Sequence, residues 1–314
     1  MNNDSSQSIA IDSSVGRQSA SINQPVSAKV RPVPMILKLL RFSFRVGGRI
    51  SPRVAGRIAY KLWFTPTRFK TPASEKNALE SANIKHIHIK NHIIATYSWG
   101  RSGPTVLLVH GWSGRGTQLG SFVEPLVAAG YRVLSFDAPA HGKSSGKQTN
   151  AYELADTILA LQHYYGTFAS VITHSFGGPC VALAIQRGFE TKRFVSISPP
   201  ADTLGLVEKF ISTLRIPEKA GSNLTQRIET AFGKTIWGDI SMLNTVKQLK
   251  IPGLIIHDDH DVDIEWQEGH AVAQAWKNAR FIRTTGLGHR RILRDATVVE
   301  AAVGFINNKD QESN

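Results

Sequence analysis

The chain has 314 residues, of which 41% are apolar and 19% are charged, enough for one large globular domain or two small ones. No run of about 18 apolar residues occurs, so no transmembrane helix is expected. The polar N-terminus lacks the pattern of a signal peptide. The single cysteine, Cys180, excludes an internal disulfide and favours a reducing, cytoplasmic setting.

The net charge of +13 is unevenly distributed along the chain. Residues 1–85 contain 14 Lys and Arg but only 4 Asp and Glu, whereas the remaining residues contain 23 and 20. We predict that residues 1–33 form a disordered tail and that residues 34–83 form a basic amphipathic helical extension. The basic character therefore belongs to the N-terminal part and says little about the charge of a substrate.

The extension is predicted to contain two short helices, over residues 35–46 and 52–63. Gly47-Gly48 is expected to break the segment, and Ser51 and Pro52 suit an N-cap and a first helical position. A basic residue recurs every four positions, which gives each helix a basic stripe beside an apolar one. The residues are Arg41, Arg45, Arg49, Arg53, Arg57 and Lys61, beside Val54, Ile58 and Leu62.

Two interpretations of this pattern are open. In the favoured one, the helices pack on the main domain with their arginine side chains in water. In the other, residues 35–64 make peripheral contact with an anionic membrane, at its inner face. Basic charge is the whole case for nucleic-acid binding, so no nucleic acid is expected as a partner.

From residue 84 onward the pattern changes to alternating strands and helices, which predicts an α/β domain over residues 84–314. The expected fold is a mostly parallel sheet with helices on both faces. Residues 199–250 show helical patterns but no strand, so they are predicted to form a helical cap whose apolar residues line a pocket or pack the cap onto the domain. The expected strands cover residues 84–89, 92–99, 105–110, 131–137, 169–174, 193–198, 253–257 and 279–285, and the expected helices 117–129, 151–165, 176–187, 264–278 and 293–307.

The segment THSFGG places Ser175 between a buried strand and a helix. A serine on such a sharp turn is exposed at the top of the sheet, where the helix dipole favours developing negative charge. Thr173 occupies the first position of the common G-x-S-x-G pattern, so the turn must tolerate a β-branched residue. This arrangement makes Ser175 a candidate nucleophile.

The segment HGWSG follows another buried strand. A glycine-bearing turn there can aim the backbone N–H of Trp112 at the nucleophile, and together with the N–H of Phe176 it would form an oxyanion hole. His110 is expected to shape this loop. The later segment FDAPAHGKS lacks the first glycine of a P-loop, so phosphate binding is excluded and His141 is expected to be structural.

A serine nucleophile needs a base and a group that orients the base. His289, in the loop after the last predicted strand, can reach back across the top of the sheet. The acid should follow an earlier strand, and any aspartate of the segment HDDHDVD could serve. We prefer Asp261 because the loop needs two or three residues to turn; Asp202 is a weaker alternative.

The segments HGWSG, FDAPAHGKSSG, THSFGG, HDDHD and GLGH occur in the order found in the α/β-hydrolase superfamily, which the chain resembles over about residues 84–308. The resemblance implies a triad of Ser175, His289 and Asp261, with no metal or organic cofactor. It implies cleavage of a carboxylic ester or thioester through an acyl-enzyme intermediate, and a helical cap where residues 199–250 lie. A hydrophobic small-molecule ester is the expected substrate.

Three alternatives stay open. The same triad could transfer an acyl group to an acceptor other than water. The chain could be a non-catalytic α/β-hydrolase relative that uses its pocket for binding. A metal-dependent hydrolase is disfavoured, because residues 257–261 supply good ligand types but no second cluster with matching spacing is present.

Overall fold

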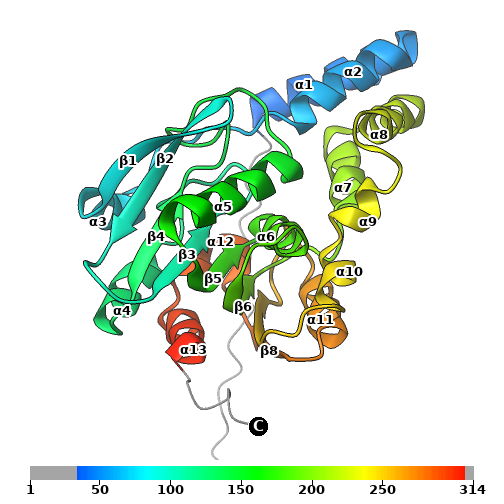
Figure 1. Ribbon diagram of the computed structural model, residues 1–314. Coiled ribbons are helices and arrows are strands. Elements are labelled where there is room, and N and C mark those ends of the chain that lie inside the picture. Colours follow the sequence, from blue (N-terminus) through cyan, green and yellow to red (C-terminus); the bar gives the residue numbers. More distant parts are fainter. Residues whose placement is uncertain (1–33, 308–314) are drawn as a thin grey trace, which may run out of the picture.

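The computed structural model describes residues 34–307, and the predicted disordered tail over residues 1–33 lies outside them. An eight-stranded sheet forms the centre of the molecule, in the order β1-β2-β4-β3-β5-β6-β7-β8 (Figure 1). Strand β1 pairs antiparallel with β2, and β2 pairs antiparallel with β4. The six strands from β3 to β8 are parallel to one another. The strands are β1 (Asn83–Ile89), β2 (His92–Trp99), β3 (Thr105–Val109), β4 (Arg132–Phe136), β5 (Phe168–His174), β6 (Thr191–Ile197), β7 (Gly253–Asp258) and β8 (Ala279–Thr284).

Helices cover both faces of this sheet because the central strands are apolar on both sides. In β3, Leu107 and Val109 pack into one core while Val106 and Leu108 pack into the other. Alternate residues of a strand point to opposite faces, so a continuous apolar run needs cover on both. The first core is covered by α5 (Ala151–Tyr165), α6 (Gly177–Gln186) and α11 (Trp266–Ala275), and the second by α4 (Val123–Ala128) and α13 (Ala296–Asn307).

The predicted fold class is confirmed, and each predicted strand is present within two residues of its expected bounds. The helix predicted over 117–129 is shorter than expected, because α4 begins only after a 3-10 turn at Gly120–Phe122. The turn before it is held by the backbone N–H of Gly116, which donates to the buried Asp137 carboxylate at 2.6 Å. That hydrogen bond fixes the loop directly before the segment in which periodicity predicts a helix.

The segment between β6 and β7 contains four helices and no strand: α7 (Leu204–Leu214), α8 (Glu218–Phe232), α9 (Ile236–Asp239) and α10 (Met242–Val246). A short helix before the sheet, α3 (Lys76–Glu80), follows a 3-10 turn at Ala73–Glu75. Among the described residues, no helix has both the length and the apolar character needed to cross a membrane.

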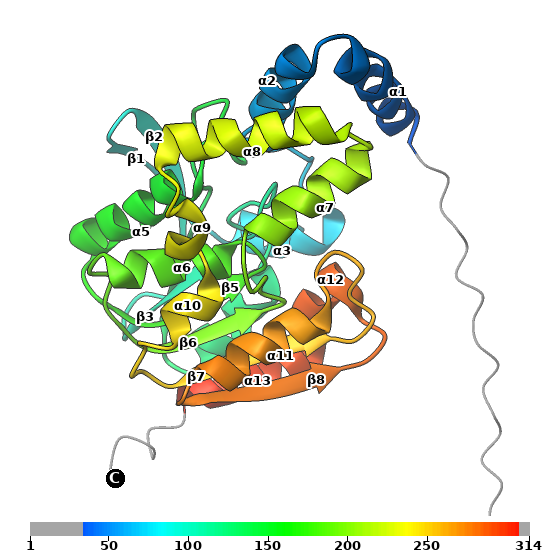
Figure 2. The same cartoon turned by 90° about the vertical axis from the view of Figure 1, so that its right-hand side faces the viewer.

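The N-terminal extension forms α1 (Met35–Ile50) and α2 (Pro52–Trp63), which lie outermost, above α8 and α7 (Figure 2). The expectation that the paired glycines end the first helix is wrong, since α1 continues to Ile50 and the chain turns at Ser51. Gly48 is needed inside the helix for packing: a Cβ there would lie 2.8 Å from the Pro217 ring.

A second glycine brings α2 against the segment between β6 and β7. A Cβ on Gly56 would lie only 2.4 Å from Oδ1 of Asn223 in α8, so the Asn223 side chain packs directly against the backbone of α2. Ala55 and Ala59 are buried on the same side of α2. One side of the extension is therefore packed on the rest of the molecule.

Candidate active site

Ser175 sits on the turn between β5 and α6 with a φ of +51°, in the left-handed region that non-glycine residues rarely occupy. Its N–H donates to the Ile197 carbonyl at 2.9 Å, and its own carbonyl accepts from Gly178 at 2.9 Å. The turn is thus held by a hydrogen bond to β6 and by one in the first turn of α6. Backbone strain of this kind is characteristic of functional positions, and here it exposes the serine side chain.

Thr173 fits this turn without steric difficulty. Its hydroxyl is buried between β5 and β6 and donates to Oγ of Ser196 at 2.8 Å. The β-branched side chain therefore uses the strand partner opposite it, Ser196, as its hydrogen-bond acceptor. The departure from the common glycine is compatible with the serine turn.

Two glycines allow other chain segments to approach Ser175 closely. A Cβ on Gly111 would lie 2.9 Å from Cβ of Ser175, and a Cβ on Gly177 would lie 2.8 Å from the His110 carbonyl. The loop after β3 is therefore in direct contact with the serine turn. Neither the Trp112 amide nor the Phe176 amide donates a hydrogen bond to another described residue. Both predicted oxyanion-hole donors are thus free to donate a hydrogen bond to a ligand atom.

His110 and His141 stabilise the loop that carries Trp112. His110 accepts from the Ala138 amide at 3.0 Å through Nε2, and His141 accepts from the Ser113 amide at 3.0 Å through Nε2. Burial lowers the pKa of His110 to about 4 and that of His141 to about 3. Neutral rings with both nitrogens hydrogen-bonded hold loops in place, as the sequence predicted for these two residues.

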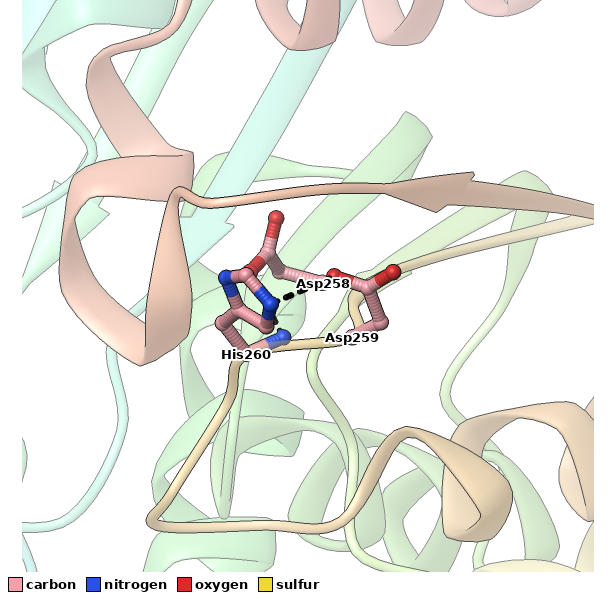
Figure 3. A group of neighbouring side chains, drawn as sticks. All are labelled: Asp258, Asp259 and His260. Atoms are coloured by element: carbon pink, nitrogen blue, oxygen red, sulfur yellow. Dashed lines mark hydrogen bonds and ion pairs between the residues drawn. The ribbon is translucent and has the colours of Figure 1, made fainter. Parts of the chain in front are cut away.

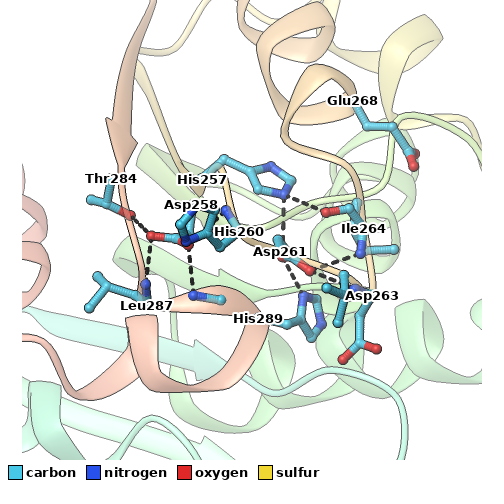
Figure 4. A network of polar contacts seen from close by, with 12 residues as sticks. His257, Asp258, His260, Asp261, Asp263, Ile264, Glu268, Thr284, Leu287 and His289 are labelled. Carbon is cyan, nitrogen blue, oxygen red and sulfur yellow. Dashed lines mark hydrogen bonds and ion pairs between the residues drawn. The ribbon is translucent and has the colours of Figure 1, made fainter. Parts of the chain in front are cut away.

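Asp261 lies in the loop after β7, and His289 lies in the short helix α12 (Gly288–Arg291) that follows β8, so the two side chains meet (Figure 4). Nδ1 of His289 lies 2.7 Å from Oδ2 of Asp261, and Oδ1 accepts from the amides of Asp263 and Ile264 at 2.9 Å each. Burial raises the pKa of the Asp261 carboxyl, but hydrogen bonds from His257 and His289 outweigh burial and bring it well below its ordinary value of 3.8. Asp261 is therefore an ionised acceptor.

Among the alternatives for the acid, the structure gives Asp258 a different task. Oδ1 accepts from the amides of His260 and Gly288, and Oδ2 accepts from the Leu287 amide and the Thr284 hydroxyl. Asp258 thus ties β7 to the loop that carries His289 (Figure 4). Asp202 accepts from the Gly205 amide at the start of α7 and makes no hydrogen bond to His289.

Asp258, Asp259 and His260 form a group whose ligand-type atoms lie within 4.8 Å of one another (Figure 3). Asp258 has its oxygens occupied by the four donors just described, and Asp259 pairs with Arg283 at 3.2 Å. These contacts give Asp258 and Asp259 a structural role in the turn after β7. His86 and His88 are exposed on one face of β1, away from this group in the sequence.

His174 was not singled out by the sequence analysis as a site residue. Its ring is buried, lies 4.6 Å from the His289 ring between centroids, and bonds the His289 carbonyl through Nε2 at 2.8 Å. Burial lowers the pKa of His174 well below its ordinary value, so the ring is neutral and donates to that carbonyl. His174 is adjacent to Ser175 in the chain, so this bond links the serine turn directly to the loop of His289.

Two cavities meet at Ser175. One, of about 680 Å³, has a lining of mixed polar and apolar side chains that includes Ser175, His174 and His289. The other, of about 430 Å³, runs from Ser175 into the helices above it and is mostly apolar. Its walls include Leu206, Phe210 and Leu214 of α7, Ile228 and Phe232 of α8, and Trp112 and Phe176 beside the serine.

Trp63 and Phe64 also line the apolar cavity, although they belong to the N-terminal extension. Trp63 makes an edge-to-face contact with Phe210, at 5.3 Å between ring centroids. The sequence alone predicts that only the segment over 199–250 covers the site. An apolar pair at the end of a helix could equally pack a core, so no local signal distinguishes the two roles.

Comparisons with known proteins bear on the fold of the chain. A model of the alpha/beta hydrolase family matches residues 106–241. The magnesium-chelatase 30 kDa subunit of Rhodobacter capsulatus is 33% identical over 137 residues, which are 42% of this chain and 47% of that protein. The chain spans less than half the length of the curated relatives it matches.

Solved structures share the fold at low sequence identity. A crystal structure described as a lipase from Acinetobacter baumannii AYE has a TM-score of 0.59 and 18% identity, covering 76% of this chain and 97% of its own. A membrane phospholipase A has a TM-score of 0.57 and 17% identity, covering 87% and 98%. Together with the sheet order, these structures show that the chain has the α/β-hydrolase fold, and the family model matches residues 106–241 of it.

Proposed function

We propose that this protein is a serine hydrolase that cleaves a carboxylic ester or thioester, with Ser175 as nucleophile, His289 as base and Asp261 as the acid. The observation that carries the proposal is the 2.7 Å contact between the ionised Asp261 and His289, whose side chain lines the same cavity as Ser175. Strained backbone at Ser175 and two free amides beside it supply the other parts of an acyl-transfer site.

The proposed reaction has two halves. Oγ of Ser175 attacks the substrate carbonyl while Nε2 of His289 takes its proton, and the amides of Trp112 and Phe176 stabilise the oxyanion. The intermediate collapses, and the alcohol or thiol leaves with the proton from His289. Water then attacks the acyl-enzyme with His289 again as base, which releases the acid and restores Ser175. Asp261 keeps Nδ1 of His289 protonated throughout.

The apolar cavity supports a hydrophobic acyl group as the substrate class. It begins at Ser175 and ends among Phe210, Phe232 and Trp63, with few polar atoms to pair with a polar chain. A polar substrate there would leave hydrogen bonds unmade, whereas an alkyl chain gains about 0.8 kcal/mol for each buried methylene. The cavity of about 680 Å³, which has more polar groups in its lining, suits the alcohol or thiol part of the substrate.

Labelling with a fluorophosphonate probe tests the proposal without knowledge of the substrate. We expect stoichiometric labelling of the natural protein and none of Ser175→Ala, because only an activated serine reacts. Hydrolysis of a series of p-nitrophenyl esters from acetate to decanoate would follow. Absence of labelling in protein with a normal circular dichroism spectrum and melting curve would contradict the proposal.

A further inference from the structure

The outer face of α1 and α2 is apolar. Eight of the thirteen large hydrophobic side chains exposed in the described residues fall between Met35 and Ile58. In α1, from Ile36 onward, they recur every three or four residues, which places them on one stripe of the helix. The eight are Met35, Ile36, Leu39, Phe42, Val46, Ile50, Val54 and Ile58, which we call the outer stripe.

The opposite side of each helix is already used for packing. Phe44 and Gly48 of α1 are buried, as are Ala55, Gly56 and Ala59 of α2. The outer stripe is therefore not the side that holds the helices on the molecule. Leu39 and Phe42 are 58% and 63% exposed, which is unusual for clustered side chains of this size.

The charges beside the outer stripe indicate what covers it. Residues 35–64 contain seven Lys and Arg and no Asp or Glu. Six of these cations are exposed, and none forms an ion pair with another described residue. Arg41 is half-buried and donates to the Thr213 carbonyl at 2.8 Å. The six are Lys38, Arg45, Arg49, Arg53, Arg57 and Lys61.

We propose that the outer stripe and its flanking cations form a binding surface for an anionic lipid bilayer. Apolar side chains enter the boundary between headgroups and acyl chains, while Lys and Arg remain beside the lipid phosphates. Unpaired cations with no acidic residue among them match an anionic partner, and the apolar stripe between them matches an acyl layer. A nucleic acid would use the cations and leave the stripe in water.

This surface is also connected to the candidate active site. α2 carries both Val54 and Ile58 of the outer stripe and, at its end, Trp63 of the apolar cavity. Docking would therefore bring the cavity that starts at Ser175 close to the lipid layer. This second step, which rests on the proposed function, identifies the substrate class as acyl esters that reside in a bilayer.

Cosedimentation with vesicles tests the surface. The full chain is mixed with vesicles of phosphatidylcholine alone or with a third of phosphatidylglycerol. We expect binding to the anionic vesicles only, weakened by salt. Replacing Arg45, Arg49 and Arg53 with Gln should weaken it by about fivefold for each cation, or about a hundredfold together. Leu39→Ser with Phe42→Ser should weaken it by at least about tenfold.

Two controls make the test specific. Lys247, Lys250 and Lys277, all exposed and outside α1 and α2, are replaced together with Gln, which removes the same total charge. This variant should bind vesicles as the natural chain does. Ser175→Ala should also bind normally, so a failed labelling experiment would remove the proposed function and leave the bilayer surface intact.

Three outcomes would overturn the proposal. Equal vesicle binding by the arginine triple variant and the natural chain would show that these cations do not contribute to bilayer binding. Tighter binding to a short DNA duplex than to anionic vesicles at equal salt would favour a nucleic acid. Absence of vesicle binding with a dimer that Leu39→Ser and Phe42→Ser abolish, measured by sedimentation velocity, would assign the face to a second copy of this chain.

Discussion

The carboxyl edge of the sheet and the helices above it are stabilised in different ways. At the edge, loop positions are held by hydrogen bonds from buried side chains: Asp258 accepts four, Asp261 accepts two from backbone amides, and Asp137 fixes the turn before α4. Above it, α1, α2, α7 and α8 meet through aromatic rings and glycines. Directional bonds suit a site that positions reacting atoms, whereas apolar packing suits a wall that accepts an alkyl chain.

The largest expected effect concerns the acid at the carboxyl edge. Asp261→Asn should lower kcat/KM for p-nitrophenyl butyrate by roughly 10³ or more, because the amide no longer fixes the tautomer of His289. Asp263→Asn is the matched control. It should change kcat/KM by less than about tenfold, because Asp263 contacts Asp261 only through its backbone amide. The reverse ranking would move the acid to another residue.

The same edge should be sensitive to mild acid. The pKa values of His110 and His141 are lowered to about 4 and about 3 in the folded protein, whereas an exposed histidine has a value of 6.5. Stability is therefore complete above pH 6.5 and is lost as the pH falls toward 4, because the unfolded chain gains protons first. For each of the two rings, the free energy of unfolding should fall by about 1.4 kcal/mol for each unit by which the pH drops in this range.

Urea unfolding at pH 7.5, 6.0 and 5.0 measures this loss. His141→Gln keeps a hydrogen-bonding side chain that does not titrate, so its stability should fall less steeply over the same range. An unchanged slope in this variant would mean that His141 is not among the groups that couple folding to pH.

The contact between α2 and α8 can be disrupted at one atom. Gly56→Ala should lower the free energy of unfolding by about 1–3 kcal/mol, because the new Cβ overlaps Asn223. Gly47→Ala is the control: no atom lies within 4 Å of its Cβ, so the helix should gain about 0.5–1 kcal/mol. Adding Asn223→Gly to Gly56→Ala should recover part of the loss. Equal effects of the two alanines would contradict close packing at Gly56.

The smallest effect is expected at the cavity wall. Trp63→Ala removes the ring that contacts Phe210, so kcat/KM for a decanoyl ester should fall about tenfold while that for an acetyl ester stays unchanged. Tyr164→Ala, an exposed aromatic of α5, controls for the loss of a ring. Equal loss on both esters would indicate a structural role for Trp63.

Much of the sheet could be predicted from the sequence because its signals are local. Continuous apolar runs such as Thr105–Val109 need burial on both faces, and that requirement predicts parallel strands covered by helices. Ser175 was recognisable for the same reason, since a strand, a sharp turn and a helix follow one another along the chain. The meeting of Asp261 with His289 was predicted from loop positions, and the structure brings the two together.

The sequence by itself determined the fold class, the succession of strands and helices along the chain, and the basic charge of residues 35–64. Only the tertiary structure decided that Gly48 and Gly56 seat α1 and α2 on the rest of the molecule, that Asp258 holds the loop of His289, and that Trp63 joins the cavity wall. These contacts join residues far apart in the chain. A glycine, an aspartate or a tryptophan carries no local sign of the partner it will meet, because that partner is set by how the helices and loops pack.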